Sequence, residues 1–337
     1  MRLMQVMAGA SRGGAELFFE RLAFGLSRAG ARTPRQHFII RKGERAERLK
    51  AAGFKVDEFS FGGPLDILTP YRIRRRMRTF EPDIVLAWMS RAAKATSNET
   101  SLLVGRLGGY YNLKYFRHCQ YLVCNTEDIR RYVIAQGWDQ NRAYVLPNFV
   151  PDPGYFVREP TQYPIRLLAL GRFHRNKGFD ILLAALKFAD GVVLTLAGQG
   201  PEECKLRALV KSYGLEGRVQ FVGWRNNLTS LFARADILVC PSRHEPLGNV
   251  ILDAWAHGVP VIAAASQGPR QLINSGHSGV LVPVNDVAAL ANAIREMTQS
   301  ETLRTLVGAA GRAVYESNFS EARVVNSYLD FFEHVTR

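Results

Sequence analysis

Short apolar runs of strand length alternate with stretches of helical periodicity along the whole 337-residue chain. This alternation is typical of α/β domains with parallel sheets, because two parallel strands must be joined by a crossover, usually a helix. The turn-rich stretch Pro147–Gly154 interrupts the rhythm once. We therefore expect two doubly wound, Rossmann-like domains, residues 1–150 and 151–319, followed by an amphipathic segment over residues 320–337.

The expected elements follow from this periodicity. In the first domain we expect strands near Leu3–Met7, Phe38–Arg41, Lys55–Phe59, Ile84–Ala87, Leu102–Val104 and Tyr121–Cys124, and helices over Ala15–Ala29, Pro70–Phe80 and Glu127–Gln136. In the second we expect strands near Arg166–Leu170, Val192–Ala197, Val219–Val222, Ile237–Cys240 and Pro260–Ala263, and helices over Phe179–Leu186, Cys204–Tyr213, Val250–His257 and Val287–Thr298. Doubly wound sheets bind ligands beyond the carboxyl ends of their strands, so we expect a ligand in a cleft that the two domains face.

Composition excludes several classes of protein. No run approaches the roughly 18 apolar residues of a transmembrane helix, and the N-terminus is typical of a first strand rather than of a signal peptide. The four cysteines form no Cys-x-x-Cys pair, and three of them have apolar or aromatic neighbours. We expect these three to be buried, reduced thiols, which points to the cytoplasm.

The net charge of +14 is unevenly distributed. Residues 1–150 carry 25 Lys and Arg against 13 Asp and Glu, a net charge of +12, whereas residues 151–337 carry 19 against 17, a net charge of +2. A basic first half suggests an anionic partner, which could be nucleic acid, an anionic membrane surface or a phosphorylated glycolipid. A charge that serves only solubility is the remaining alternative.

The first of three distinctive loops contains Gly13 and Gly14, which follow the first expected strand and open a helix. Glycines at such a place let the backbone approach a ligand closely, and the helix N-terminus favours negative charge. The spacing matches neither the Gly-x-Gly-x-x-Gly pattern nor the P-loop, so neither a dinucleotide site nor a P-loop is supported. An ordinary turn would use the same residues.

The second loop, residues 171–178, directly follows the expected strand Arg166–Leu170. Its cations Arg172 and Lys177 stand five residues apart. Arginine can bind two phosphate oxygens at once, and lysine supplies a point charge. The pair suits a diphosphate whose negative charge grows as its bond to a sugar breaks. A solvated basic loop is the alternative interpretation.

The third segment, residues 241–260, places Glu245 just after an expected strand and Asp253 about two helical turns further on. Carboxylates there can accept hydrogen bonds from sugar hydroxyls, and the free N–H groups of a helix start can hold phosphate. Glu245 alone would also fit an ordinary helix cap. The candidate ligand-binding residues in this segment are Glu245, Pro246, Leu247, Gly248, Asn249 and Asp253.

Together the three loops resemble the family 4 glycosyltransferases of the GT-B type, which have two Rossmann-like domains. The resemblance extends over nearly the whole chain, and its most specific parts are residues 171–178 and 241–260. Further segments that agree with it are Pro147–Asn148, Gly198–Pro201, Phe221–Gly223 and Leu281–Asp286.

The resemblance implies a retaining transfer from a nucleoside-diphosphate-sugar, in which the leaving phosphate helps to take the acceptor's proton. It implies that Arg172 and Lys177 hold the donor diphosphate, that Glu245 contacts the donor sugar, and that Asp253 contacts the ribose. The glycine loop at Gly13–Gly14 would face the donor phosphates and the acceptor. The first domain would bind the acceptor and the second the donor, and the final helix would cross back to the first domain.

The chain departs from the family pattern at two places. Asp253 stands where the family usually has Glu, and the segment Val104–Tyr111 lacks the His that many members place near the sugar. Arg106 could take over part of the electrostatic role of that His, or the subgroup could do without it. We expect Arg106, Tyr110 and Arg91 on the acceptor side.

The donor site is expected to work without a metal or another cofactor. The chain has no Asp-x-Asp sequence, and its seven histidines form no cluster with metal-ligand spacing. Arg172 and Lys177 stand where a divalent cation would otherwise neutralise the diphosphate.

The segment Tyr71–Phe80 carries five arginines on about two helical turns, with Ile73, Met77 and Phe80 spaced to face inward. Beside the basic first half, it suits docking to the anionic inner-membrane leaflet or to a phosphorylated lipid saccharide, although an ordinary covering helix would look the same. The stretches 88–93 and 106–125 resemble the subgroup that builds bacterial lipopolysaccharide cores.

The leading hypothesis is therefore a cytoplasmic glycosyltransferase, peripheral on the inner face of the membrane, that uses a lipid-linked saccharide acceptor. A transferase with a small soluble acceptor and a GT-B sugar-nucleotide epimerase are the enzymatic alternatives. A nucleic-acid-binding protein is the non-enzymatic one, but the sequence has no helix-turn-helix, zinc or aromatic-rich basic motif, so we expect no nucleic acid partner.

Overall fold

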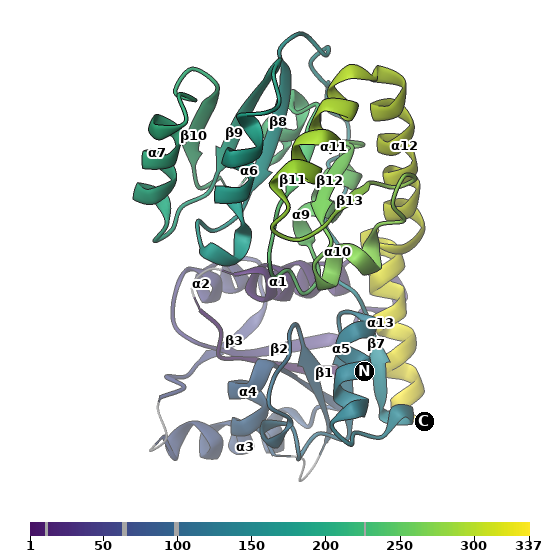
Figure 1. Ribbon diagram of the computed structural model, residues 1–337. Helices are drawn as coiled ribbons and strands as arrows, with labels where there is room; N and C mark the ends of the chain where they lie inside the picture. The colour runs from purple at the N-terminus through teal and green to yellow at the C-terminus, as the bar shows by residue number, and fades with distance from the viewer. Residues whose placement is uncertain (11–12, 63–65, 98–100, 226) are drawn as a thin grey trace. The chain divides into compact units, whose positions relative to one another are not determined.

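The computed structural model describes residues 1–10, 13–62, 66–97, 101–225 and 227–337. The chain forms two compact units, the first made of Met1–Phe149 with Glu321–Arg337 and the second of Val150–Ser320 (Figure 1). Each unit is built on a parallel sheet, which confirms the doubly wound α/β class.

The first unit contains a seven-stranded sheet in the order β3-β2-β1-β4-β5-β6-β7. Every neighbouring pair in it is parallel. The strands are β1 (Arg2–Met7), β2 (Arg35–Ile40), β3 (Lys55–Glu58), β4 (Ile84–Trp88), β5 (Leu102–Leu107), β6 (Tyr121–Cys124) and β7 (Ala143–Val145), and the helices are α1 (Gly14–Ser27), α2 (Glu44–Ala51), α3 (Leu68–Phe80), α4 (Met89–Ala95), α5 (Glu127–Ala135) and α13 (Glu321–Thr336).

Alternation along each strand divides the apolar side chains of this unit between two faces of the sheet. In β1, Leu3 and Met7 pack with α1 and α13 in one cluster, whereas Met4 and Val6 pack with α3, α4 and α5 in another. Because helices cover both faces, the central strand β4 is apolar and buried along its whole length, as expected for a buried parallel sheet, whereas the edge strand β3 is mostly polar.

The final helix α13 belongs to the first unit, although it follows the whole of the second in the sequence. Its apolar face, which includes Val325 and Tyr328, packs against α1 and is buried with it. At the contact, Gly25 of α1 leaves room for Val325, because a Cβ atom at residue 25 would lie 2.7 Å from the Val325 side chain.

The second unit contains a six-stranded sheet in the order β10-β9-β8-β11-β12-β13, again with parallel neighbours. Its strands are β8 (Ile165–Leu170), β9 (Val192–Ala197), β10 (Val219–Gly223), β11 (Ile237–Cys240), β12 (Val261–Ala264) and β13 (Val280–Val282), and its helices are α6 (Phe179–Leu186), α7 (Glu203–Ser212), α8 (Thr229–Arg234), α9 (Asn249–Ala256), α10 (Gln267–Leu272), α11 (Val287–Gln299) and α12 (Glu301–Asn318).

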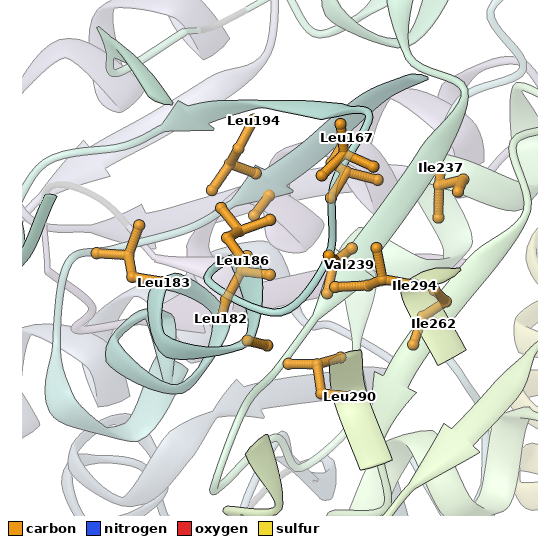
Figure 2. Packing of buried hydrophobic residues seen from close by; sticks show 14 of the residues in the cluster. Leu167, Leu182, Leu183, Leu186, Leu194, Ile237, Val239, Ile262, Leu290 and Ile294 are labelled. Atoms are coloured by element: carbon orange, nitrogen blue, oxygen red, sulfur yellow. The ribbon is translucent and has the colours of Figure 1, made fainter. Parts of the chain in front are cut away.

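The core on one face of this sheet is aliphatic. Leu167 of β8 and Val239 of β11 point toward Leu182 and Leu186 of α6, with Leu290 of α11 beside them (Figure 2). The opposite face packs against α8, α9 and α12 around Trp255, which is fully buried.

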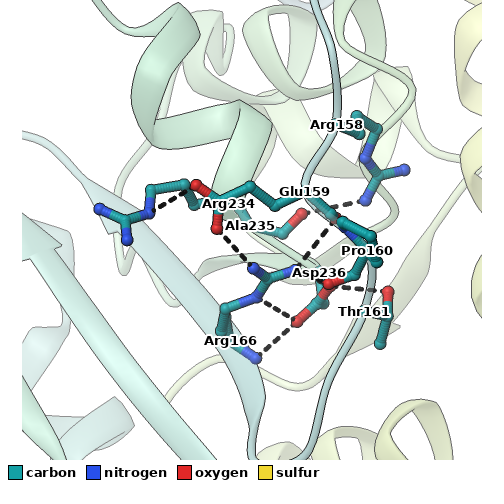
Figure 3. Close-up of polar contacts among 8 residues, drawn as sticks. All are labelled: Arg158, Glu159, Pro160, Thr161, Arg166, Arg234, Ala235 and Asp236. Carbon is teal, nitrogen blue, oxygen red and sulfur yellow. Dashed lines mark hydrogen bonds and ion pairs between the residues drawn. The ribbon is translucent and has the colours of Figure 1, made fainter.

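An ion pair joins the amino ends of β8 and β11 (Figure 3). The Arg166 guanidinium donates to both carboxylate oxygens of Asp236, at 2.9 Å each, and Thr161 donates to the same carboxylate at 2.8 Å. Although burial by itself opposes ionisation, the hydrogen bonds from Arg166 and Thr161 hold the pKa of Asp236 below its ordinary value. The pair therefore fixes these two central strands at the edge of the sheet where both begin.

Several short elements and one long helix were not expected from the sequence. The strands β7 and β13 have only three residues each, too few to show a period, and α12 contains Gly308 and Gly311, which weaken a helical pattern. The structure explains these glycines by close packing. A Cβ atom at Gly311 would lie 2.3 Å from the indole ring of Trp255, and one at Gly308 would lie 2.6 Å from the carbonyl oxygen of Gly258.

Within the described part of the chain, no helix has both the length and the apolar character needed to span a bilayer.

The packing of Gly311 generates a test of the core. We expect Gly311→Ala to lower the free energy of unfolding by about 1–3 kcal/mol, because the added methyl group overpacks the contact with Trp255, even though alanine is the better helix former. Gly217→Ala is the control, since nothing lies within 4 Å of a Cβ atom at residue 217. Urea unfolding of both variants checks this, and a Gly311→Ala protein as stable as the wild type would contradict it.

Candidate functional site

The order of the second sheet brings two distant loops together. Strands β8 and β11 are parallel neighbours, so their carboxyl ends lie at the same edge of the sheet. The loop of residues 171–178 follows β8, and the loop of residues 241–248 follows β11. Backbone hydrogen bonds join the two loops, because the N–H groups of Arg243 and His244 donate to the carbonyl oxygen of Asn176 at 2.7 and 3.2 Å.

Glycine makes this close approach possible. Gly178 has φ of 66°, in the left-handed region, and a Cβ atom there would lie 2.1 Å from the carbonyl oxygen of Pro241. Between β8 and Gly178 the chain makes a single 3-10 turn, η4 (Arg175–Lys177), which the His174 side chain caps by accepting from the Asn176 N–H at 3.2 Å. The turn and the glycine together determine where Lys177 leaves the backbone.

Lys177 and Glu245 form an ion pair between these two loops. Their side chains are 24% and 12% exposed, so both charges are largely withdrawn from water. Although burial opposes the charge on Lys177, the neighbouring Glu245 carboxylate holds the pKa of this ammonium group above its ordinary value. The Ser242 hydroxyl also donates to Glu245, at 3.4 Å. The structure thus brings together two of the residues that the sequence predicted, and Arg172 is exposed on the same loop as Lys177.

The segment after Glu245 turns sharply into a helix. Pro246 is half-buried and Leu247 is buried, Gly248 takes φ of 99°, and Asn249 is the first residue of α9. Asp253 is buried one turn further along α9, with 9% exposure, and its backbone carbonyl lies 2.7 Å from Nδ1 of His257.

Gly268, which the sequence analysis did not single out, supports this turn from β12 and α10. Its N–H donates to the carbonyl oxygen of Glu245 at 2.7 Å. A Cβ atom at residue 268 would lie 2.2 Å from the carbonyl oxygen of Leu247, so no other residue would fit without moving the loop. The available signal was a glycine shortly after an expected strand, at the start of the next helix.

Two further residues that the sequence analysis missed are Arg243 and Asp180. They form an ion pair in which the Arg243 guanidinium donates to both carboxylate oxygens at 2.7 Å. Arg243 stands in the loop after β11, and Asp180 stands in the first turn of α6. Arg243 closely follows the end of a strand, where charged residues of a parallel sheet converge, whereas Asp180 lies well beyond β8, inside a helix, where no such signal marks it.

In the first unit, Gly13 and Gly14 frame the start of α1, with Gly13 extended at φ of 168° and Gly14 the first helical residue. The Glu16 carboxylate folds back beneath this loop and accepts from the Ala10 N–H at 2.9 Å. A Cβ atom at Gly13 would lie 2.2 Å from Oε2 of Glu16. Gly13 therefore makes room for an internal carboxylate, a reason for glycine that the sequence analysis did not consider.

The structure does not place Arg106 where it could contact an acceptor, which corrects the sequence-based expectation. The side chain is 1% exposed and lies between the rings of Phe18 and Trp88, with its guanidinium carbon 4.8 Å from each ring centroid. It donates to the Asn148 side chain and, at 3.4 Å, to the Tyr328 hydroxyl. Arg106 is thus part of the core that joins β5 to α13.

The other two acceptor-side candidates are more accessible. Arg91 is exposed on α4, and Tyr110 is half-buried after β5, where its hydroxyl donates to the Asp128 carboxylate. Tyr110 also packs edge-on against Tyr132 of α5, at 5.3 Å between ring centroids.

The described residues contain no group of three or more His, Cys, Asp or Glu side chains arranged to hold a metal ion.

Known proteins are similar to this chain over nearly its whole length. Residues 158–314 match the family model described as glycosyl transferases group 1. The chain is 34% identical over 327 residues to the lipopolysaccharide core biosynthesis glycosyltransferase LpsE of Rhizobium meliloti, which covers 94% of this chain and 95% of that protein. It is 33% identical over 343 residues to LpsD, of the same description and organism, with 99% and 98% covered.

Solved structures share the fold. The crystal structure of Anabaena HepE in complex with UDP aligns with a TM-score of 0.86 at 22% identity, over 99% of this chain and 100% of that one. The apo form of the lipopolysaccharide outer core galactosyltransferase WaaB aligns with a TM-score of 0.80 at 18% identity, again over 99% and 100%.

The burial of Arg106 leads to a prediction. We expect Arg106→Ala to lower the free energy of unfolding by at least about 2 kcal/mol, because it leaves a cavity and removes the hydrogen bonds that Arg106 donates to Asn148 and Tyr328. Arg91→Ala, at an exposed site, should change it by less than about 0.5 kcal/mol. Thermal and urea unfolding check this, and a fully stable Arg106→Ala protein would contradict the core assignment.

Proposed function

The chain belongs to the group 1 glycosyl transferases, and from this premise we propose that it transfers a hexose from a nucleoside-diphosphate-sugar to a lipid-linked saccharide in lipopolysaccharide core biosynthesis. The observation that carries the proposal is the meeting of Lys177 and Glu245 beyond the carboxyl ends of β8 and β11, with the exposed Arg172 on the same loop as Lys177. The names of the relatives LpsE and LpsD support the acceptor class. The complex of HepE with UDP supports a nucleotide donor.

In this proposal Arg172 and Lys177 bind the donor diphosphate. Without donor, Glu245 neutralises Lys177, and a diphosphate would offer the ammonium group a second, more highly charged partner. Glu245 would then accept hydrogen bonds from the hydroxyls of the donor sugar, and Asp253 would accept from the ribose. The backbone turn over Pro246–Asn249 would lie along the sugar and phosphate, where the first N–H groups of α9 favour negative charge.

The chemistry that these residues support is departure of the nucleoside diphosphate with retention of configuration. Negative charge accumulates on the leaving diphosphate, and Arg172 and Lys177 stabilise it most when the sugar bond is nearly broken. Two fixed cations perform the task that a divalent metal ion would otherwise perform, so we propose that the reaction needs no metal. The leaving phosphate oxygen is the group that we expect to take the acceptor's proton.

The donor can be identified without knowing the acceptor. UDP-, GDP- and ADP-glucose and the corresponding galactose and mannose donors are tested for thermal stabilisation of the protein, with and without EDTA. One nucleotide should raise the melting temperature, because a ligand that binds only the folded state stabilises it, and EDTA should not change the shift. If no nucleotide-sugar stabilises the protein, the proposed function is wrong. Stabilisation that EDTA abolishes would contradict the metal-free reaction.

The acceptor side is proposed from the surface of the first unit. Helix α3 buries Ile73 and Met77 and exposes its five arginines, of which Arg76 also pairs with Asp57. The start of the helix exposes three apolar side chains, those of the N-cap residue Ile67 and of Leu68 and Tyr71, at 79%, 59% and 62%. Exposed apolar groups beside clustered arginines fit the interface of an anionic membrane, where a lipid-linked acceptor would be presented.

The diphosphate site generates a kinetic prediction. We expect Arg172→Ala and Lys177→Ala each to lower turnover by roughly 10²–10³-fold at a saturating concentration of the nucleotide-sugar. This is the loss seen when one hydrogen-bonding group that stabilises the transition-state charge is removed. Arg295→Ala, which removes an exposed arginine of α11, is the control. Steady-state rates of donor hydrolysis check this, and near-normal turnover in both site variants would remove the loop from the diphosphate site.

The basic helix generates a second prediction. The protein should sediment with anionic vesicles at low salt, because each basic residue near the surface contributes about 1 kcal/mol. Binding should fade toward 1 M salt as the Debye length falls from about 10 Å to about 3 Å. Replacing Arg74, Arg75 and Arg78 with Gln should weaken vesicle binding and leave donor binding intact.

The matched control for this charge change replaces Arg207, Lys211 and Arg295 of the second unit with Gln, and should bind vesicles like the wild type. If the wild-type protein does not bind anionic vesicles even at low salt, the membrane proposal is wrong. A small soluble acceptor then becomes the better hypothesis.

A further inference from the structure

Arg243 joins three separate segments at the carboxyl edge of the second sheet. Its guanidinium donates to both carboxylate oxygens of Asp180 at 2.7 Å, to the carbonyl oxygen of Arg175 at 2.8 Å, and to the side-chain oxygen of Asn285 at 2.6 Å. These partners lie in the first turn of α6, in η4, and in the loop between β13 and α11. Although burial opposes its charge, the hydrogen bonds and charge of Arg243 hold the pKa of Asp180 below its ordinary value.

The partners of Arg243 stand next to the two proposed donor ligands. Arg175 lies two residues before Lys177 in the same 3-10 turn, and Arg243 itself lies two residues before Glu245. The guanidinium therefore connects the backbone that carries the ammonium group to the backbone that carries the carboxylate. The planar group with its five N–H donors can reach all these acceptors at once, which a lysine could not do.

We propose that Arg243 is a positioning residue for glycosyl transfer. Through Asp180, Asn285 and the Arg175 carbonyl group it holds the loop of Lys177 against the loop of Glu245, so that both groups are in place before the donor binds. This inference rests on the proposed roles of Lys177 and Glu245. It assigns Arg243 no contact with the donor.

The chain contains a matched pair at the other end of the same strands. Arg166 likewise forms a bidentate ion pair with Asp236, at the amino ends of β8 and β11. The side chain of Arg166 is 23% exposed, and that of Arg243 is 21% exposed. The Arg166 pair links β8 to β11 directly, whereas the Arg243 pair links the loop after β11 to the first turn of α6, at the edge that carries Lys177 and Glu245. Arg166→Gln therefore controls for the loss of a buried ion pair without disturbance of the donor loops.

The first experiment measures turnover in donor hydrolysis, with whichever of UDP-, GDP- and ADP-glucose stabilises the wild type. Arg243→Gln should lower kcat by about 10–100-fold, because misplacement of binding groups by about 1 Å can cost that much. Arg243→Lys should not restore kcat, since lysine lacks the planar guanidinium group that donates to several acceptors at once. Arg166→Gln should keep kcat within about 2-fold of the wild type even if its melting temperature falls equally.

A double-substitution cycle separates positioning from direct contact with the donor. If Arg243 acts through Asp180, Asp180→Asn should also lower kcat, and the variant with both changes should be no slower than the worse single variant. If the two effects multiply, or if Asp180→Asn turns over like the wild type, the positioning role is overturned. Asn285→Gly, which keeps the left-handed backbone at φ of 65° and removes only one acceptor, should lower kcat by a few-fold.

A second measurement uses the ligand-free protein and needs no activity. Hydrogen exchange of the backbone amides in residues 174–178 and 243–248 should accelerate at least 10-fold in Arg243→Gln, and should stay at the wild-type rate in Arg166→Gln. Unchanged exchange in Arg243→Gln would overturn the inference. A wild type that binds no nucleotide-sugar would instead overturn the proposed function, while the exchange data would still decide whether Arg243 holds the two loops.

Discussion

The parallel pairing of β8 with β11 is the constraint on which the site depends. Two segments separated by about 70 residues meet only because both strands end at the same edge of the sheet. Glycine then allows backbone to pack directly on backbone, since a Cβ atom at Gly178 would collide with Pro241 and one at Gly268 would collide with Leu247. The ion pair of Lys177 and Glu245 follows from this framework, because neither charge could be withdrawn from water without the other.

Ion pairs stand at both edges of this sheet, near the two central strands. Arg166 and Asp236 stand where β8 and β11 begin, whereas Arg243, in the loop after β11, pairs with Asp180 in the first turn of α6. A buried ion pair of this kind contributes little net stability but penalises any displacement of one partner. The first pair therefore holds the two strands together where they begin, and the second holds the loop after β11 against the start of α6.

The sequence predicted most of this framework, because buried parallel strands are short continuous apolar runs and the helices between them show a 3.6-residue period. It also predicted Lys177 and Glu245 as site residues, because charged residues directly after such strands converge at one edge. It could not predict α12, whose glycines weaken the helical pattern and make sense only beside Trp255. Nor could it assign Arg243, since the three partners that define its role come from segments far apart in the chain.

The arginines show why residue type alone could not separate structural from functional positions. Arg106 was expected on the acceptor side because it lies in the segment where many family members have a His, yet two aromatic faces, the Asn148 amide and the Tyr328 hydroxyl accommodate its charge inside the core. Arg243 likewise has protein acceptors for its guanidinium. Among the residues that the structure describes, none forms a hydrogen bond or ion pair with the guanidinium of Arg172, which is exposed on the same loop as Lys177. The proposed phosphate contact of Arg172 therefore rests on its position after β8 and on its exposure, and not on its residue type.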